Sequence, residues 1–550
     1  MAFKHPVEYL DPSMVHAISP VVCNDLELES MYNIAFKPQH KYAEQMIHQW
    51  KTKFTSDVEY LQQTQQVVKN CDKNSIESCA IDTNAIDTVF NDVFTVSGFC
   101  DRYCYIDIEH VKFVNENSTF MGFWTVANLL SPLISLVLPL LLLVAPFVLL
   151  KIQGVPISFD AYLSILKSLA LKHSLGKAFS SFDSSSLNGL VYLLFSLAMY
   201  GIQTYQNIKS CIRFYNNIYT VNTNLIAIQT FLKTTLQNMK SFIVVNAGLS
   251  KYSEFCADLS NSFDKLSELQ RLLSDIQPYH FGFSKMFEIG NLLKCYYALQ
   301  KYKDCIQYAM AFEGYLDNLR GIQTLKCAEL INNTEINTCI ENQVYPVLYN
   351  NAEAVQNTVD LSNNIIITGP NASGKTTVLK TTAINIIFTQ QFGAGYYSKC
   401  VLKPYTQIHS YLNIPDTSGR DSLFQAEARR CKEILDIVDS AKDERHFCIF
   451  DELFSGTNAE EATVASVGLL NYIQSKPNVD FMLTTHFINV PSKITGRIMN
   501  MKMDATLEAN SIHFTYKLVP GISEIKAAKL ILLQMGFPDD VLNAFACDDV

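Results

Sequence analysis

The sequence predicts an α/β domain at the C-terminal end of the chain, preceded by an all-helical region into which an apolar hairpin is inserted. Three features indicate this architecture. Short apolar strands alternate with helical patterns over residues 346–550. Apolar residues recur at helical spacing over residues 209–345 and in part of residues 1–119. Residues 120–150 contain no charged residue in 31 positions.

The composition narrows the classes of protein that fit this architecture. Hydrophobic residues make up 48% of the chain and charged residues only 17%, which is apolar for a soluble protein. The net charge of −10 argues against a general nucleic-acid binder, although a local basic patch could still contact DNA. The 15 cysteines show no paired C-x-x-C spacing, so we expect no zinc site. Because 550 residues are too many for a single core, we divide the chain into four regions.

The first two regions differ in polarity. Residues 1–119 are polar and are predicted to form the N-terminal helical part of the core. Residues 120–208 are predicted to insert into a membrane as one or two transmembrane helices, because about 20 apolar residues span a bilayer core. A buried core helix is the alternative, but such helices rarely run so far without a charge. Three prolines are expected to kink or split the first apolar run: Pro132, Pro139 and Pro146.

A second uncharged stretch, Ser184 to Ile208, is shorter and less apolar than the first. Two spans would return the chain to the side that it left, whereas a re-entrant hairpin would leave every loop on one side. Both arrangements stay open, and either one leads us to expect a membrane protein whose C-terminal domain faces the cytoplasm. Residues 209–345 are predicted to follow as a helical core and lever arm.

A phosphate-binding motif lies near the start of the fourth region, residues 346–550. It follows the apolar strand Ile365 to Thr368 and leads into a helical stretch, which is the context of a P-loop NTPase. The motif G-x-x-x-x-G-K-[ST] is formed by Gly369, Pro370, Asn371, Ala372, Ser373, Gly374, Lys375 and Thr376, and Thr377 follows it. Its backbone N–H groups favour phosphate, Lys375 would contact the β- and γ-phosphates, and Thr376 would bind Mg²⁺. A plain glycine-rich turn is the alternative interpretation.

Two further apolar strands, Phe447 to Phe450 and Phe481 to Leu483, are followed by residues that suit the same chemistry. After the first strand, we expect Asp451 to hold Mg²⁺ through its water shell and Glu452 to polarise the attacking water. After the second, His486 is expected to sense the γ-phosphate, although a lone histidine is more often structural. The expected cofactors are therefore ATP and Mg²⁺.

The segments ITGPNASGKTT, DELFSGTNAEEA and LTTHF together resemble the ATPase domain of the MutS family, the DNA mismatch-repair ATPases and their relatives. The run from Ser422 to Glu427 resembles the family's Ser-Thr-Phe-x-x-Glu sequence, and residues 516–523 and 536–538 resemble its C-terminal dimerising segment. The resemblance implies an ABC-type ATPase fold, a homodimer, and a role for Ser422 in the ATP site of the neighbouring subunit. A helix N-cap is the other interpretation of Ser422.

The sequence also departs from the mismatch-repair enzymes. Ala372 and Ser373 stand where those enzymes usually carry Met and Gly, and Leu423 replaces the Thr after the signature serine. No N-terminal mismatch-reading domain fits into the chain, and the only Phe-x-Glu, at residues 450–452, is already assigned to ATP hydrolysis. Mismatch recognition is therefore not expected, and the resemblance is to short MutS relatives with two membrane segments.

Three functions are compatible with these features. The first is a membrane-anchored, dimeric, MutS-like ATPase that clamps either DNA or a protein. The second is the nucleotide-binding subunit of a membrane transporter, although the sequence contains no LSGGQ signature. The third is a scaffold that uses ATP to remodel a membrane complex without contacting DNA.

Overall fold

A computed structural model of the protein describes residues 3–73, 82–154, 187–278, 286–331, 337–412, 422–508, 511–525 and most of 531–542, together with residue 414 and a few residues between 158 and 168. The chain forms two compact units. Unit 1 comprises residues 1–78, 237–263 and 307–550, and unit 2 comprises residues 79–236 and 264–306. The division of the sequence into four regions stays a prediction.

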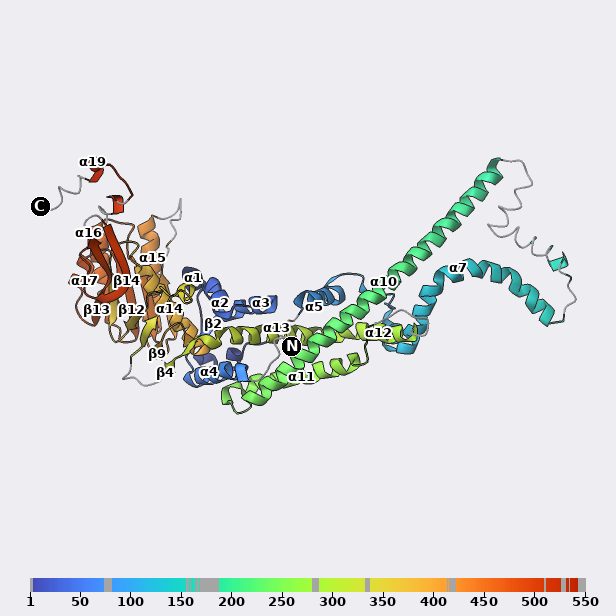
Figure 1. Ribbon diagram of the computed structural model, residues 1–550, viewed down its shortest axis with the longest axis horizontal. Coiled ribbons are helices and arrows are strands. Elements are labelled where there is room, and N and C mark those ends of the chain that lie inside the picture. The colour runs from blue at the N-terminus through green and yellow to red at the C-terminus, as the bar shows by residue number, and fades with distance from the viewer. Residues whose placement is uncertain are drawn as a thin grey trace. The chain divides into compact units, whose positions relative to one another are not determined.

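The centre of unit 1 is a six-stranded sheet with the order β10-β11-β12-β7-β13-β14 (Figure 1). Neighbouring strands are parallel except β13 and β14, which form an antiparallel hairpin. The strands are β7 (Asn364–Thr368), β10 (Gln407–Tyr411), β11 (His446–Asp451), β12 (Val479–Thr485), β13 (Ile498–Glu508) and β14 (Ser511–Pro520). The three strands expected from the sequence are thus β7, β11 and β12, which lie side by side. Their carboxyl ends meet at one edge of the sheet, where ligands bind in folds of this kind.

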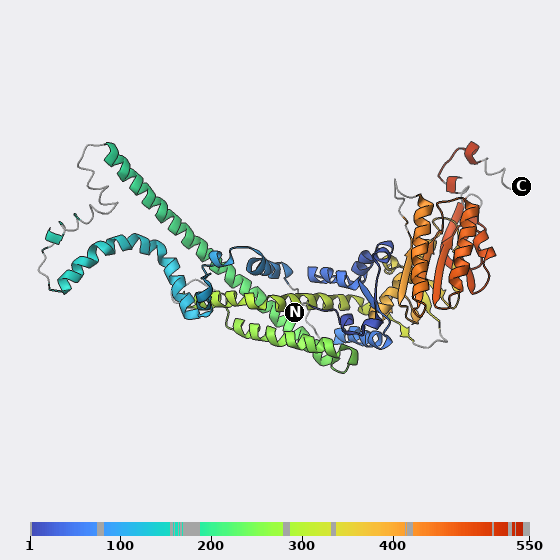
Figure 2. The ribbon, with the colours of Figure 1, turned by 180° about the vertical axis from the view of Figure 1, so that it is seen from behind.

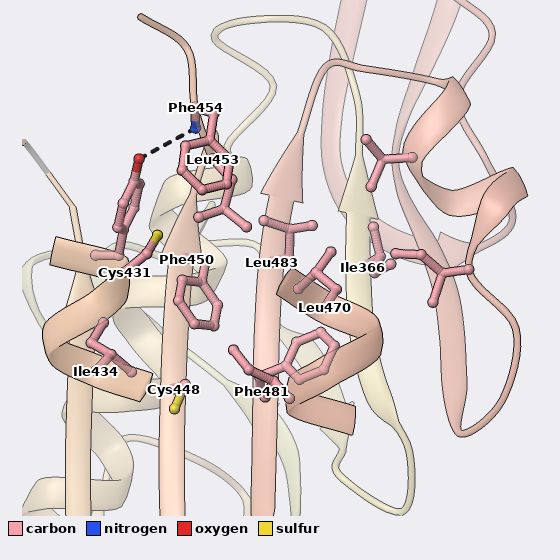
Figure 3. Close-up of a cluster of buried hydrophobic side chains, with 14 of the residues drawn as sticks. Ile366, Cys431, Ile434, Cys448, Phe450, Leu453, Phe454, Leu470, Phe481 and Leu483 are labelled. Carbon is pink, nitrogen blue, oxygen red and sulfur yellow. Dashed lines mark hydrogen bonds between the residues drawn. The ribbon is translucent and has the colours of Figure 1, made fainter. Parts of the chain in front are cut away.

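Helices cover both faces of this sheet, as a parallel sheet requires. Helix α14 (Lys375–Phe392) contacts β11 and β12 on one face. Helices α15 (Leu423–Ser440) and α16 (Ala459–Gln474) pack on the other face over the apolar cluster of Figure 3. Phe450 and Phe481, which belong to this cluster, are fully buried, and each stabilises the fold by roughly 1.5–3 kcal/mol.

A smaller, four-stranded sheet has the order β4-β9-β5-β6. Three of its strands precede β7 in the sequence, and β9 follows α14. Its strands are β4 (Glu329–Leu330), β5 (Cys339–Gln343), β6 (Asn357–Asp360) and β9 (Lys399–Leu402). The remaining strands of unit 1 are β1 (Val15–Ala17), β2 (Lys53–Thr55), β3 (Lys326–Cys327) and β8 (Ala394–Gly395). Its other helices are α1 (Pro20–Asp25), α2 (Leu28–Phe36), α3 (Lys41–Trp50), α4 (Val58–Lys73), most of α13 (Lys303–Gly321), α17 (Asn489–Lys493) and α19 (Asp539–Leu542).

The N-terminal segment is joined to the C-terminal end of α14 by two buried glutamines. The Gln391 side chain donates to the backbone oxygen of Lys53 at 2.7 Å and accepts from the Tyr32 hydroxyl at 2.7 Å. The Gln390 side chain donates to the backbone oxygen of Thr55 at 3.1 Å and to that of Tyr405 at 2.7 Å. Because buried amides must be paired, these bonds fix α14 against the N-terminal segment.

Unit 2 is helical. It contains α5 (Thr83–Phe90), α6 (Phe99–Arg102), α7 (Ser118–Ile152) and α12 (Met286–Ala298), and it shares α10 (Leu187–Asn246) and α11 (Ser253–Leu273) with unit 1. A polar cluster lies inside it: the Tyr103 hydroxyl donates to the Asp92 carboxylate at 2.5 Å, and the Tyr296 hydroxyl and the Arg102 guanidinium donate to the same carboxylate. The charge of Asp92 is therefore satisfied by hydrogen bonds within the unit.

The prediction of a membrane location is wrong, and the predicted membrane partner is unsupported. Among the described residues, no helix combines the length and the apolar character that crossing a bilayer requires. The first uncharged run forms most of α7, whose initial turns pack on α12: a Cβ on Gly290 would lie 2.5 Å from the backbone nitrogen of Gly122. Met121 and Thr125 are also buried there, so protein contacts account for this part of the apolar run.

The second uncharged stretch begins outside the described residues and continues as the start of α10, a helix of 60 residues. Most of the segment between the two stretches also lies outside the described residues, so neither predicted topology can be described. Helix α7 passes through Pro132, Pro139 and Pro146 without being split, and it bends along its length, as both views show (Figures 1 and 2).

Candidate nucleotide-binding site

The loop of residues 369–374 joins the buried end of β7 to the first turn of α14. Gly374 is the N-cap of the helix with φ of 94°, and Ala372 has φ of 65°. A Cβ on Gly369 would lie only 2.9 Å from the Ser373 hydroxyl oxygen, so a larger residue would strain the loop. A tight loop at a helix N-terminus presents backbone N–H groups and the positive end of the helix dipole, which is a site for phosphate.

Lys375 begins α14 and is buried against the loop that precedes it. Its ammonium group donates to the backbone oxygens of Gly369 at 2.9 Å and Pro370 at 3.2 Å, and to the Asn371 side-chain oxygen at 3.3 Å. Burial lowers the pKa of Lys375, and the nearby carboxylates of the site oppose this shift. A phosphate anion next to this group would stabilise its charged form more strongly than backbone carbonyls do.

Thr376 and Asp451, which the sequence predicts as the Mg²⁺-binding pair, lie together. The Thr376 hydroxyl is 2.9 Å from one Asp451 carboxylate oxygen and 3.2 Å from the other, and the Thr484 hydroxyl at the end of β12 also donates to this carboxylate. A hydroxyl and a carboxylate are hard oxygen ligands, which Mg²⁺ prefers. Within the described ranges no group of three His, Cys, Asp or Glu side chains forms a metal cage. The pair therefore suits an ion that keeps several waters and phosphate oxygens as ligands.

Glu452 and His486 lie at the same edge of the sheet. The Glu452 carboxylate is 3.5 Å from His486 Nδ1 and 3.7 Å from Lys375 Nζ. A hydrogen bond from His486 lowers the pKa of Glu452, and the charge of Lys375 lowers it further. Glu452 has φ of 51°, and its backbone N–H donates to the Thr484 oxygen at 3.0 Å. The backbone thus holds this carboxylate, in its charged form, beside the phosphate-binding loop.

The phosphate-binding loop and the end of β11 border a cavity of about 630 Å³, a size typical of small-ligand sites. The predicted residues that line it are Asn371, Ala372, Gly374, Lys375, Thr376, Thr377, Asp451 and Glu452. A second cavity, of about 410 Å³, is lined by Gly369, Pro370, Asn371 and His486 among others. Asn371 lines both cavities, so the phosphate-binding loop borders each of them.

Part of the cavity wall was not predicted as a site. Tyr345 and Leu348 line it from the segment before β6, and Met503 and Tyr516 line it from the hairpin of β13 and β14. Aromatic and apolar side chains opposite a phosphate loop provide a surface for the base of a nucleotide. Tyr345 and Tyr516 lie in segments that resemble the MutS family, at residues 341–346 and 516–523, whereas Leu348 and Met503 carry no motif spacing.

Two predicted residues lie away from the cavities. The Ser373 side chain is fully buried, and its hydroxyl oxygen has no hydrogen-bond partner among the described residues. Ser422 caps α15: its hydroxyl accepts from the Gln425 backbone N–H at 3.3 Å, and the Gln425 side chain accepts from the Ser422 N–H at 2.9 Å. Within one chain Ser422 therefore acts as a helix N-cap, and a role in a neighbouring site stays a proposal.

The C-terminal part of the chain is similar to known proteins. Residues 365–547 match the family model of MutS domain V. The chain is similar to the protein named Endonuclease MutS2 from Staphylococcus aureus (strain MRSA252), with 26% identity over 251 residues, and to that from Staphylococcus epidermidis (strain ATCC 12228 / FDA PCI 1200), with 25% identity over 249 residues. Each alignment covers 44% of this chain and 31% of the relative. The chain thus spans about a third of the length of the curated relatives that it matches.

Proposed function

Because the chain belongs to the MutS family through its C-terminal part, we propose that it binds ATP with Mg²⁺ and hydrolyses it at two composite sites of a homodimer. The observation that carries this proposal is the pairing of Thr376 with Asp451 at 2.9 Å, next to the phosphate-binding loop. A cation held by this pair would lie beside the place where the loop and Lys375 would hold phosphates.

Each residue of the site has a part in the proposed reaction. The loop N–H groups and Lys375 bind and orient the phosphates, and Glu452 polarises the attacking water. Thr376 and Asp451 would hold Mg²⁺, which supplies positive charge that stabilises the phosphate oxygens when it is bound. The hydrogen bond from His486 orients Glu452 and lowers its pKa, so that the carboxylate stays charged to more acidic pH.

ATP hydrolysis is tested with phosphate release from the intact, purified chain. Wild-type protein should hydrolyse ATP only when Mg²⁺ is present. Lys375→Ala should lose ATP binding, because it removes the cation at the phosphate loop. Lys399→Ala is the matched control, since the Lys399 side chain is 61% exposed and pairs with Glu341 at the surface. Absence of hydrolysis by the wild-type chain would refute the proposal.

The composite site is tested by complementation between two inactive variants. Lys375→Ala removes the lysine beside the phosphate-binding loop, and Ser422→Ala removes the serine that is proposed to reach the neighbouring site. A mixed dimer would keep one site with both groups intact, so mixing the two variants should restore part of the activity. No restoration on mixing, with dimers present, would show that Ser422 does not act across subunits.

DNA is the proposed partner of the ATP-bound homodimer. The relatives are named endonucleases, which concerns nucleic acid, but the alignments cover 31% of their length, and we do not extend nuclease activity to this chain. Because the net charge is −10, contact with DNA would need a local cationic surface. Binding should therefore weaken steeply between about 50 and 200 mM salt. No binding at the lower salt concentration would exclude DNA and leave a protein partner.

A further inference from the structure

The segment that follows Glu452 has an unusual backbone. Glu452 and Phe454 have φ of 51° and 58°, so two non-glycine residues within three positions lie in the left-handed region. Such conformations are sparsely populated and persist only where the surrounding structure holds them. Residues 454–457 form a turn between β11 and α16. The contacts that hold this turn therefore help to fix the direction of the Glu452 carboxylate.

Glu427, on the second turn of α15, supplies two of these contacts. It is only 2% exposed, and its carboxylate accepts from the Ser455 hydroxyl at 2.9 Å and from the Gly456 backbone N–H at 3.1 Å. A buried carboxylate must be paired with donors, and both donors come from the turn. The Tyr411 hydroxyl accepts from the Phe454 backbone N–H at 3.3 Å, the dashed line of Figure 3.

The same turn packs directly on the start of α15. A Cβ on Gly456 would lie 2.7 Å from the Phe424 backbone nitrogen and 2.8 Å from Leu423 Cγ, so only glycine allows this approach. The rings of Phe424 and Phe454 lie 5.7 Å apart between centroids. The turn after Glu452 and the first two turns of α15, which Ser422 caps, therefore form one packed body.

We propose that Glu427 is a positioning residue: it fastens the turn of residues 454–457 to α15 and thereby keeps Glu452 oriented for hydrolysis. The inference rests on the proposed ATPase function. Glu427 does not line either cavity of the nucleotide site, so its effect passes through the turn and not through contact with ATP. A shift at the N-terminus of α15 would reach Glu452 by the same contacts.

The test compares hydrolysis with nucleotide affinity in Glu427→Gln. This variant keeps the shape of the side chain but replaces the carboxylate with a neutral amide, which weakens the charge-assisted bonds from Ser455 and Gly456. We expect kcat to fall about tenfold while the Kd of ATP changes less than about twofold, because ground-state binding is untouched. Ser455→Ala removes one of the same bonds from the other side. Adding it to Glu427→Gln should lower kcat by less than the two separate effects combined, because both changes act on one linkage.

A control variant and a stability measurement separate positioning from a general loss of structure. Glu433→Gln changes an exposed carboxylate on the same helix, which pairs with Arg430 at 3.2 Å, and it should leave kcat unchanged. A purely structural role for Glu427 would lower Tm and ATP affinity together, and this outcome would overturn the proposal.

If Glu427→Gln does not fold, Ser455→Ala decides alone: a lower kcat at constant Kd supports the proposal, and an unchanged kcat overturns it. Wild-type protein without ATPase activity would refute the proposed function as well, whereas active wild type with an equally active Glu427→Gln refutes only this inference.

Discussion

The Thr376 hydroxyl lies 2.9 Å from the Asp451 carboxylate, although the two residues are 75 positions apart in sequence. Thr376 belongs to the first turn of α14 and Asp451 ends β11, two strands away from the strand that leads into α14. Thr484, on the strand between them, donates to the same carboxylate. The parallel sheet therefore brings a hydroxyl and a carboxylate from separate segments to one point, where they could share a cation.

Thr376→Val should selectively remove the effect of Mg²⁺ on ATP binding. Valine keeps the shape of the side chain but lacks the oxygen that is proposed to bind the ion. Affinity for ATP with Mg²⁺ should fall by at least about tenfold, as for losses around metal ligands. Affinity without Mg²⁺ should stay the same. Titration of a fluorescent ATP analogue with and without Mg²⁺ measures both values.

The matched control for this change is Thr463→Val on α16, whose hydroxyl donates to the Ala459 oxygen of its own helix at 2.7 Å. It should bind ATP like wild type under both conditions. Equal losses of affinity with and without Mg²⁺ in Thr376→Val would contradict a metal role for this hydroxyl.

Glu452→Gln should stop hydrolysis and leave ATP binding in place. The amide cannot polarise the attacking water, and removal of a general base typically lowers the rate by about 100-fold or more. The Lys375 ammonium group lies 3.7 Å from Glu452 and would no longer face a negative charge there, so ATP affinity should not fall. Single-turnover phosphate release gives the rate, and equilibrium binding gives the affinity. Glu460→Gln, an exposed change at the start of α16, serves as the control.

His486→Ala should move the acidic limb of the pH–rate profile to higher pH. The hydrogen bond from His486 is the largest cause of the lowered pKa of Glu452, so its loss raises that pKa toward the value of an ordinary glutamate. Because a carboxylate with a lowered pKa loses its charge only as the pH falls through that pKa, wild type should keep activity to more acidic pH than the variant. Rates of ATP hydrolysis measured from about pH 4 to pH 7 test this shift.

His513→Ala is a suitable control for the pH experiment, because His513 is exposed on β14. Its profile should match that of wild type. An acidic limb that does not move in His486→Ala would mean that the charge state of Glu452 does not set the rate in this range.

The phosphate end of the site could be predicted from the sequence because each of its parts belongs to a short, recognisable sequence pattern. The loop of residues 369–374 is contiguous, and Asp451 directly follows an apolar strand that could only be buried in the sheet. The opposite wall could not be predicted in this way. Tyr345, Leu348 and Met503 reach the cavity from a connecting segment and a hairpin, and only tertiary packing brings such apolar side chains to one surface.

The membrane location was predicted from a pattern that two environments can produce. An uncharged apolar run is expected of a helix in lipid and equally of a helix packed on protein. At the start of α7 the contact with protein involves small residues: Gly290 of α12 lies so close to Gly122 that a Cβ on Gly290 would have no room. Hydropathy averages along the run and does not contain this pairwise information.

Gly314→Ala and Gly468→Ala should change stability in opposite directions, although both glycines lie inside helices. A Cβ on Gly314, in α13, would lie 2.3 Å from the backbone oxygen of Tyr42, and overpacking of this kind costs about 1–3 kcal/mol. Gly468, on α16, is exposed and has no atom within 4 Å of such a Cβ. Alanine there should stabilise the protein by roughly 0.5–1 kcal/mol, because glycine loses more backbone entropy on folding.

Urea unfolding followed by the fluorescence of Trp50 measures this pair of changes. Trp50 is 2% exposed and stacks on Tyr315 in unit 1, which contains both glycines, and Trp124→Phe removes the other tryptophan. The midpoint should fall for Gly314→Ala and rise for Gly468→Ala at similar slopes. If Gly314→Ala also raises the midpoint, the close approach of α13 to the backbone of α3 is not present in the folded protein, because helix propensity alone would then account for both results.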